Sequence, residues 1–374
     1  MKKILLATTV LAMSAGFAAA DVSVSGDGRM GVVSSDGVMT FSNRMRIKFS
    51  GSGTTDGGLS FGGSFRAHEA ATAESAGTKG SVFISGAFGK VTMGSVDSGD
   101  AASVGQLASV GYTGLGSGNS ISYAADAGGD NSGIGTRTDA GGARVLYTYS
   151  AGALTVNASS AQLTDGGATA YGIGGSYTSG AMTIGLGYGV VNGGSLSALK
   201  SYGTATGAAA AAYTTISAAA DSSVTDLSLS ASYVMGATTV KAIYQAKTLD
   251  ASIAAQAATT ALPVLAATSI STTATSMGMS VVHKIDALSL TAYAISTELD
   301  IADALSADNP TVSRYGVGFG YDLGGGASVV GGWATVDAVK ATAITAAATA
   351  GELQKYTASS VGVDKFDLGL SLSF

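Results

Sequence analysis

The chain has 374 residues, of which 55 are Gly and none is Cys; only 12% are charged, and the formal net charge is −6 at pH 7. The absence of Cys excludes a disulfide framework and thiolate chemistry, and the acidic balance argues against a nucleic-acid partner. Beyond residue 20, no run of about 18 apolar residues occurs, as a membrane-spanning helix would require. The apolar residues are instead spread along the chain.

The first 20 residues are typical of a secretory signal peptide. "MKKILLATTVLAMSAGFAAA" begins with Lys2 and Lys3, continues with an apolar stretch and ends in an A-x-A cleavage site at 18–20. A membrane anchor is the alternative, which the short length and the small residues at its end disfavour. We therefore predict an exported chain that starts at Asp21.

From residue 21 onward, apolar and polar residues alternate with the period of two that is typical of β-strands. In "FSNRMRIKF" (41–49), the aromatic and aliphatic residues share one face and the three basic residues share the other. "LSFGGSFRAH" (59–68) and "VKAIYQAK" (240–247) show the same separation. The period of 3.6 residues that marks amphipathic helices is nearly absent, so the sequence favours an all-β fold.

The alternation and the turn residues predict sixteen strands. Their ranges are 22–33, 38–50, 59–68, 80–86, 89–95, 143–150, 154–162, 169–177, 182–190, 225–234, 238–249, 275–283, 288–297, 313–322, 327–337 and 359–374. From residue 87 onward, short turns such as "AFGK" (87–90) alternate strictly with long connections, of which 96–142 is the longest. We interpret the Ala-rich stretches 204–223 and 250–274 as loops.

Short turns at one end and long loops at the other are typical of outer-membrane barrels. We therefore predict a 16-stranded antiparallel transmembrane β-barrel over residues 21–374. Lipid requires that every backbone polar group be paired within the protein, so the sheet has to close. The last nine residues, "FDLGLSLSF", alternate without a break, and we expect them to pair with 22–33. We interpret the many glycines as aids to tight turns and strand curvature.

Several stretches resemble the general porins of Gram-negative outer membranes, in particular the alphaproteobacterial branch. They are "DVSVSGDGRMGV", "RMRIKFSGSGTTDGGLSFGGSF", "VFISGAFGKVTMGSVDS", "YDLGGGASVVGGWA" and "FDLGLSLSF". The resemblance implies an outer-membrane homotrimer, in contact with membrane lipid, for the passive diffusion of small hydrophilic solutes. It also implies that 96–142 contains a third loop that folds into the barrel, and that Phe374 is part of the signal read by the outer-membrane assembly machinery.

The polar face of the first three predicted strands carries a basic series. Its members are Arg29, Arg44, Arg46, Lys48 and Arg66, and Arg144 and Arg314 are further candidates. Adjacent strands lie about 4.8 Å apart, so these side chains would form one wall of the lumen. The long connection 96–142 supplies the acids Asp97, Asp100, Asp126, Asp130 and Asp139.

These charges predict a pore constriction in which the basic wall faces Asp97 and Asp100, which come just after a predicted strand. Charged rings and linings are how many pores select their solutes. Two alternatives stay open at this point. The charges can be unrelated and solvated, and the loop can lie outside the barrel.

The sequence favours a general diffusion porin without enzymatic activity, with a substrate-specific channel for anions or sugars as the alternative. An enzyme in a barrel would need a nucleophile motif, and no G-x-S-x-G elbow precedes a helix. A surface structural or adhesive protein is opposed by the terminal Phe374 and the turn rhythm. No cofactor is predicted, because two histidines and no Cys make a poor zinc site. Loop acids suit Ca²⁺, but "GGDNSGIG" (128–135) fits neither EF-hand nor RTX spacing, so solvated loop acids are favoured.

Overall fold

The computed structural model describes residues 21–70, 73–126, 144–162, 169–192, 220–253, 268–301, 311–336 and 363–374. The predicted signal peptide, Asp130, Asp139 and the centres of the two Ala-rich stretches lie outside the described residues. Within the described ranges, no helix is long and apolar enough to cross a membrane.

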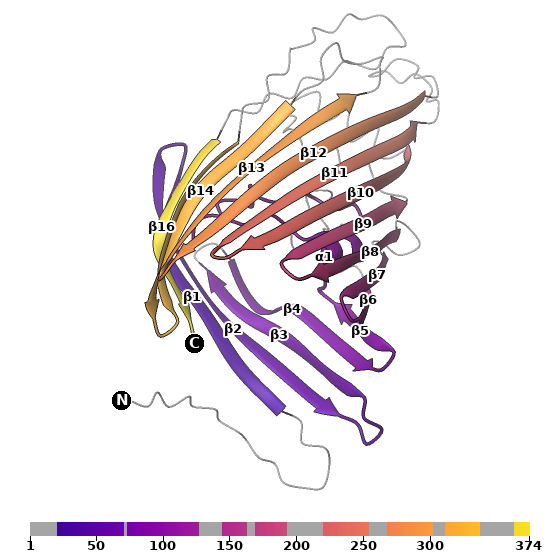
Figure 1. Cartoon of the computed structure of the whole chain (residues 1–374), viewed down its shortest axis with the longest axis horizontal. Helices are drawn as coiled ribbons and strands as arrows, with labels where there is room; N and C mark the ends of the chain where they lie inside the picture. Colours follow the sequence, from indigo (N-terminus) through magenta and orange to yellow (C-terminus); the bar gives the residue numbers. More distant parts are fainter. Residues whose placement is uncertain are drawn as a thin grey trace, which may run out of the picture.

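Within the described ranges, the structure contains the sixteen predicted strands and one short helix. The strands are β1 (Asp21–Ser35), β2 (Val38–Thr54), β3 (Ser60–Ala70), β4 (Ala73–Gly86), β5 (Gly89–Gly94), β6 (Arg144–Ala151), β7 (Leu154–Gln162), β8 (Thr169–Ser179), β9 (Met182–Asn192), β10 (Ala220–Met235), β11 (Thr238–Ile253), β12 (Thr268–Ile285), β13 (Leu288–Ile301), β14 (Thr311–Gly324), β15 (Ala327–Val336) and β16 (Val363–Ser373). The helix α1 (Gly99–Val104) follows β5 and lies within the ring of strands (Figure 1).

Each strand pairs antiparallel with its neighbours in the chain, and β1 closes the barrel by pairing with β16. The closure runs from Asp27 opposite Ser373 to Ser35 opposite Lys365. Beyond the ladder, Phe374 and Gly26 exchange two backbone hydrogen bonds of 2.6 and 3.0 Å. The predicted barrel is therefore confirmed, and its last residue takes part in the seam rather than fraying.

The two faces of the wall follow the alternation in the sequence. Large apolar side chains on the outer face are exposed, as Phe41, Leu186 and Met277 illustrate. Polar side chains at the intervening positions point inward, as Asp226 and Lys247 do. Exposed apolar groups on this scale are stable only in lipid, because a soluble protein seldom leaves such a continuous apolar surface in water.

Several strands extend further than the sequence predicted. β12 begins at Thr268 rather than at residue 275, and β11 ends at Ile253 rather than at 249. The two extensions pair with each other, with Asp250 opposite Ser271. Ser, Thr and Ala do not reveal a strand by hydrophobic alternation, yet ladder hydrogen bonds and β-branched Thr support one. The strands therefore continue into segments that we interpreted as loops.

Candidate functional site: the lumen and its two walls

The basic series forms one wall of the lumen. We call Arg29, Arg44, Arg46, Lys48 and Arg66, on the inward side of β1–β3, the basic wall. In the strand register, Arg29 lies opposite Arg44, and Lys48 lies opposite Arg66. Like charges in directly opposite positions repel, so this wall requires water or an acid beside it.

One acid belongs to the basic wall itself. Asp27 of β1 accepts a 2.9 Å hydrogen bond from an Arg44 Nη, and the two side chains form an ion pair. Asp27 also lies opposite Arg46 in the register. Arg29 donates to the Tyr112 carbonyl at 3.1 Å, which connects the edge of the wall to the segment after β5.

The opposite side of the lumen is covered by the chain itself. We call residues 98–126 the lumen segment, and the inward side of β7–β16 the covered wall. The helix α1 contacts β7, β8, β9 and β10. From there the segment runs along the wall, as three hydrogen bonds show. They join Lys241 Nζ to the Val104 carbonyl at 2.6 Å, the Ala108 amide to Ser280 Oγ at 3.2 Å, and the Thr113 amide to Asp367 Oδ2 at 2.8 Å.

The segment then returns along the same wall. Its hydrogen bonds join Arg314 to the Ser120 carbonyl at 2.8 Å, Lys247 Nζ to Ser122 Oγ at 2.7 Å, and the Ala124 amide to Asp226 Oδ1 at 2.6 Å. These partners come from β10, β11 and β14, and their side chains point inward. These hydrogen bonds therefore join residues 120–124 to inward-facing side chains of the barrel.

Apolar packing supplements these polar contacts. Val104, Leu107 and Val110 of the lumen segment form a buried cluster with residues of the covered wall that include Ile243 and Ile295. Burying one such side chain contributes about 1.5–3 kcal/mol. The segment is thus fixed both by hydrogen bonds and by an internal apolar core, which is unusual for the side of a barrel that faces water.

A buried ion pair joins the end of the lumen segment to its beginning. Arg144, the first residue of β6, binds Asp126 at 2.6 Å and also donates to the Val96 carbonyl at 2.5 Å. Asp126 accepts from the Ser98 amide at 3.1 Å. Burial raises the pKa of the Asp126 carboxyl, and Arg144 opposes that rise. Arg144 therefore anchors the segment and lies away from the basic wall.

A second acid of the segment lies against another carboxylate. A Cβ at Gly189 would lie 2.4 Å from Asp100 Oδ2 and 2.6 Å from Asp226 Oδ1, so these two oxygens are at most about 5 Å apart. Burial, followed by the charge of Asp226, raises the pKa of the Asp100 carboxyl above its ordinary value. Burial and the neighbouring carboxylate therefore favour the protonated form of Asp100.

The two acids that we expected to face the basic wall lie in different environments. Asp97 is exposed and lies just before the lumen segment, where its charge acts on Asp126. Asp100 is fully buried, at 0% exposure, between α1 and the covered wall. The prediction that Asp100 faces the basic wall is therefore corrected, because α1 turns this side chain toward β8 and β9. The five basic residues do lie together, as their register requires.

Sequence reasoning missed the residues that receive α1. Gly172 and Gly174 of β8, and Gly185, Gly187 and Gly189 of β9, occupy inward positions beneath the helix. We had interpreted the glycines as aids to turns and curvature. Their alternation with large outward residues, as in "TIGLGYG" (183–189), was the available signal. This alternation indicates an inward face without side chains, against which another part of the chain can pack.

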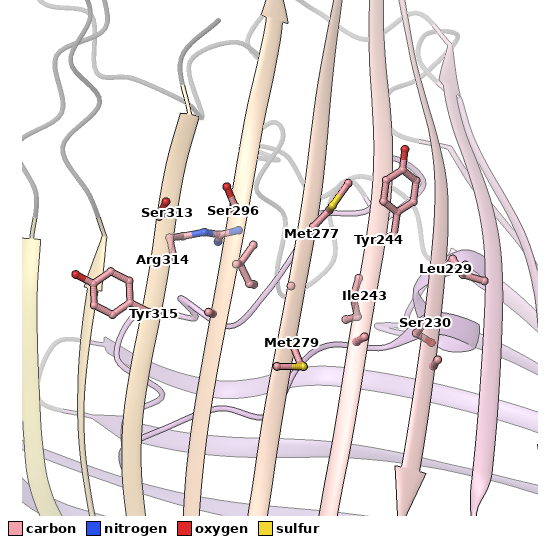
Figure 2. Close-up of a pocket in the computed structure, with 15 residues that line it drawn as sticks. Leu229, Ser230, Ile243, Tyr244, Met277, Met279, Ser296, Ser313, Arg314 and Tyr315 are labelled. Carbon is pink, nitrogen blue, oxygen red and sulfur yellow. The ribbon is translucent and has the colours of Figure 1, made fainter.

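A hollow lies on the outside of the barrel. It has a volume of about 570 Å³ and lies over β10–β14, where Leu229, Tyr244, Met277, Met279 and Tyr315 surround smaller residues (Figure 2). These side chains face away from the lumen. The hollow is therefore part of the lipid-facing surface and is not a candidate solute site.

The described residues contain no group of three His, Asp or Glu side chains placed to hold a metal ion. The stretch 128–135, considered above for Ca²⁺, lies outside the described residues.

Comparisons with known proteins agree with the barrel and its lumen. A family model described as Gram-negative porin matches residues 7–341. The chain belongs to the Gram-negative porin family. A porin of Rhodobacter capsulatus is 37% identical over 324 residues, which cover 85% of this chain and 95% of that protein. The porin described here is thus a multi-pass protein of the bacterial outer membrane and a channel for passive diffusion.

Solved structures show the same architecture. A porin structure refined at 1.8 Å resolution is 34% identical, with a TM-score of 0.66 over 95% of this chain and 100% of that chain. The outer-membrane protein OmpT of Vibrio cholerae, in its trimer form, is 15% identical, with a TM-score of 0.67 over 95% of this chain and 100% of that chain. At that identity the second similarity shows the fold alone.

Proposed function

We propose that the narrowest part of this channel lies between the basic wall and the lumen segment. The supporting observation is that the hydrogen bonds and apolar contacts of the lumen segment described above fall mainly on β7–β16, whereas Lys48 of the basic wall is exposed. In this proposal the water-filled space lies beside Arg44, Arg46, Lys48 and Arg66. The channel conducts small hydrophilic solutes and carries out no chemistry on them.

A selective channel for anions is the second candidate function. It is favoured by the charge of the uncovered wall, where five cationic side chains accompany Asp27. Of the described acids of the lumen segment, Asp100 and Asp126 are buried. Asp97, just before the segment, is exposed. Fields of this kind select by sign of charge.

The reversal potential across a planar bilayer with a salt gradient tests the constriction. An Arg44→Ser/Arg46→Ser variant should shift this potential toward cation selectivity, because it removes two positive charges from the narrow zone. A matched Lys284→Ser variant, at the turn end of β12, should leave it unchanged. An unchanged potential in the double variant would show that these arginines do not line the narrow zone. Saturation or block by one anion would favour the selective channel.

We infer that the porin forms a homotrimer through the outer face of β1–β5. Among the described exposed aromatic residues, those of β1–β5 and their turn are all Phe (Phe41, Phe49, Phe61, Phe65 and Phe88), whereas those of β6–β15 are Tyr except Phe319. A Tyr hydroxyl suits the lipid–water boundary, whereas a Phe ring has no polar group to hydrate. Phe49 and Phe65 already stack at 5.3 Å, and Phe41 is 90% exposed.

Gel electrophoresis after stepwise heating tests the trimer. Phe41→Ala/Phe61→Ala should lower the temperature at which the trimer band dissociates. The control variant Tyr171→Ala/Tyr188→Ala, on the outer face of β8 and β9, should leave that temperature unchanged. Equal effects of the two variants would show that the Phe-rich face is not the interface. A monomer band without heating would contradict the proposed trimer.

Phe374 is proposed as part of the signal read by the outer-membrane assembly machinery. Its ring packs over Gly26, where an added Cβ would lie 2.2 Å from the ring, while the side chain stays 63% exposed. An exposed ring at the seam is accessible to another protein before the barrel closes. Deletion of Phe374 should lower the yield of inserted barrel in cells but allow folding in detergent. Normal insertion of the deletion variant would contradict the proposal.

A further inference from the structure

The contact between α1 and the covered wall is a contact between backbones. A Cβ at Gly187 would lie 2.8 Å from the Cα of Asp100, and one at Gly185 would lie 2.3 Å from the carbonyl oxygen of Ser103. On the helix side, a Cβ at Gly99 would lie 2.5 Å from the carbonyl oxygen of Gly172. Neither surface has room for a methyl group where they meet.

Close approaches of glycines to the segment recur at its far end, to backbone and side-chain atoms. A Cβ at Gly332 of β15 would lie 2.5 Å from the amide nitrogen of Gly111, and one at Gly318 of β14 would lie 2.9 Å from Cβ of Val110. Between the two ends, a Cβ at Gly278 of β12 would lie 2.9 Å from Leu107 Cδ1. The glycines beneath the segment therefore extend from β8 to β15.

We propose that this glycine track, Gly172, Gly174, Gly185, Gly187, Gly189, Gly278, Gly318 and Gly332, sets the width of the channel by fixing how closely the lumen segment approaches the barrel wall. The inference rests on the proposed function, because it assumes that the segment forms one side of the narrow zone. It assigns a determinant of solute size to residues that do not line the water-filled space.

A side chain added to the track displaces the segment rather than the sheet. Each track strand is held by backbone ladders on both sides, as β9 is by β8 and β10. The helix α1 has only six residues, and side-chain hydrogen bonds such as that from the Gly99 amide to Ser159 Oγ hold it in place. Non-bonded carbon atoms settle about 3.5–4.0 Å apart, so a methyl at Gly187 moves α1 by about 1 Å toward the basic wall.

The test measures single-channel conductance and permeation of neutral sugars of graded size. Gly187→Ala should lower conductance roughly 1.2- to 2-fold and reduce the largest sugar admitted, because the narrow zone loses width. Gly332→Ala, at the other end of the track, should act in the same direction. The matched control is Gly320→Ala on the inward side of β14, where an added Cβ meets only a Val330 methyl at 3.9 Å.

Three outcomes decide the matter. Lower conductance in Gly187→Ala or Gly332→Ala, with parental conductance in Gly320→Ala, supports the track. Parental conductance in both track variants, with a normal heat-modifiable band to show that they have folded, overturns it. If Arg44→Ser/Arg46→Ser still shifts the reversal potential in that case, the constriction stands and only the track fails. If the reversal potential of that double variant is also unchanged, the proposed constriction is contradicted.

Discussion

The basic wall and the covered wall belong to one sheet and face the same lumen, yet they are made of opposite kinds of residue. Inward positions of β2 carry Arg44, Arg46 and Lys48, whereas those of β9 carry Gly185, Gly187 and Gly189. A long cationic side chain needs water around its charge, while a glycine leaves space that must be filled. The comparison teaches that water runs along one side of the barrel and protein fills the other.

Removing the anchor that holds the end of the lumen segment should have the largest effect. In Arg144→Met, the Asp126 carboxylate would remain buried without its partner, which costs about 3–5 kcal/mol in the free energy of unfolding. Urea unfolding in detergent measures this change, and limited proteolysis reports release of the lumen segment. Lys48→Met on the basic wall is the matched control, with an expected change within about 0.5 kcal/mol. Equal losses of unfolding free energy in the two variants would contradict the proposed difference between the anchored segment and the basic wall.

A single hydrogen bond at the far end of the segment should matter less. The Thr113 hydroxyl donates to Asp367 Oδ2 at 2.6 Å, and Asp367 is fully buried. Thr113→Val removes that bond and the 3.3 Å bond that the hydroxyl accepts from the Leu115 amide, while the Thr113 amide bond to Asp367 stays; we expect a loss of about 1.5–3 kcal/mol in the free energy of unfolding. Thr113→Ser keeps the hydroxyl and should remain near the parent. A parental value for Thr113→Val would mean that the tip of the segment is not held by Asp367.

The pH dependence of stability should give a smaller effect, through the buried Asp100 beneath the lumen segment. Asp100 faces Asp226 of β10, Lys247 of β11, and Asp126 with its partner Arg144; Tyr123 and Asp97 are also near. Because its pKa is raised above the ordinary 3.8, folded Asp100 keeps a proton at pH values where unfolded Asp has lost it. This contribution to stability is therefore present at low pH and is lost as pH rises through the raised pKa.

The expected result is that the unfolding temperature falls slightly as the pH rises above about 4. Asp100→Asn carries no titrating proton at this site and should flatten this profile. Profiles of the same slope in the parent and in Asp100→Asn would show that another group governs the pH dependence.

The strand order, the seam and the phase of each face were predictable because each depends on local alternation. "RMRIKF" (44–49) shows its basic face without any knowledge of its neighbours. The position of Asp100 was not predictable, since it depends on which way α1 turns when it meets β8 and β9. That meeting joins residues far apart in the chain, and only the glycines at 185–189 hint at it. Packing of a loop onto a wall leaves no periodic pattern in the loop itself.

The most direct measurement compares the accessibility of the two walls to water. The chain has no Cys, so a single thiol can be placed on either wall and treated with a charged methanethiosulfonate reagent during bilayer recording. Arg46→Cys should react rapidly and lose conductance, whereas Ser280→Cys, at a position 3% exposed beneath Ala108, should not react. Equal reaction rates at the two positions would contradict the central claim that the lumen segment covers one wall and leaves the other in water.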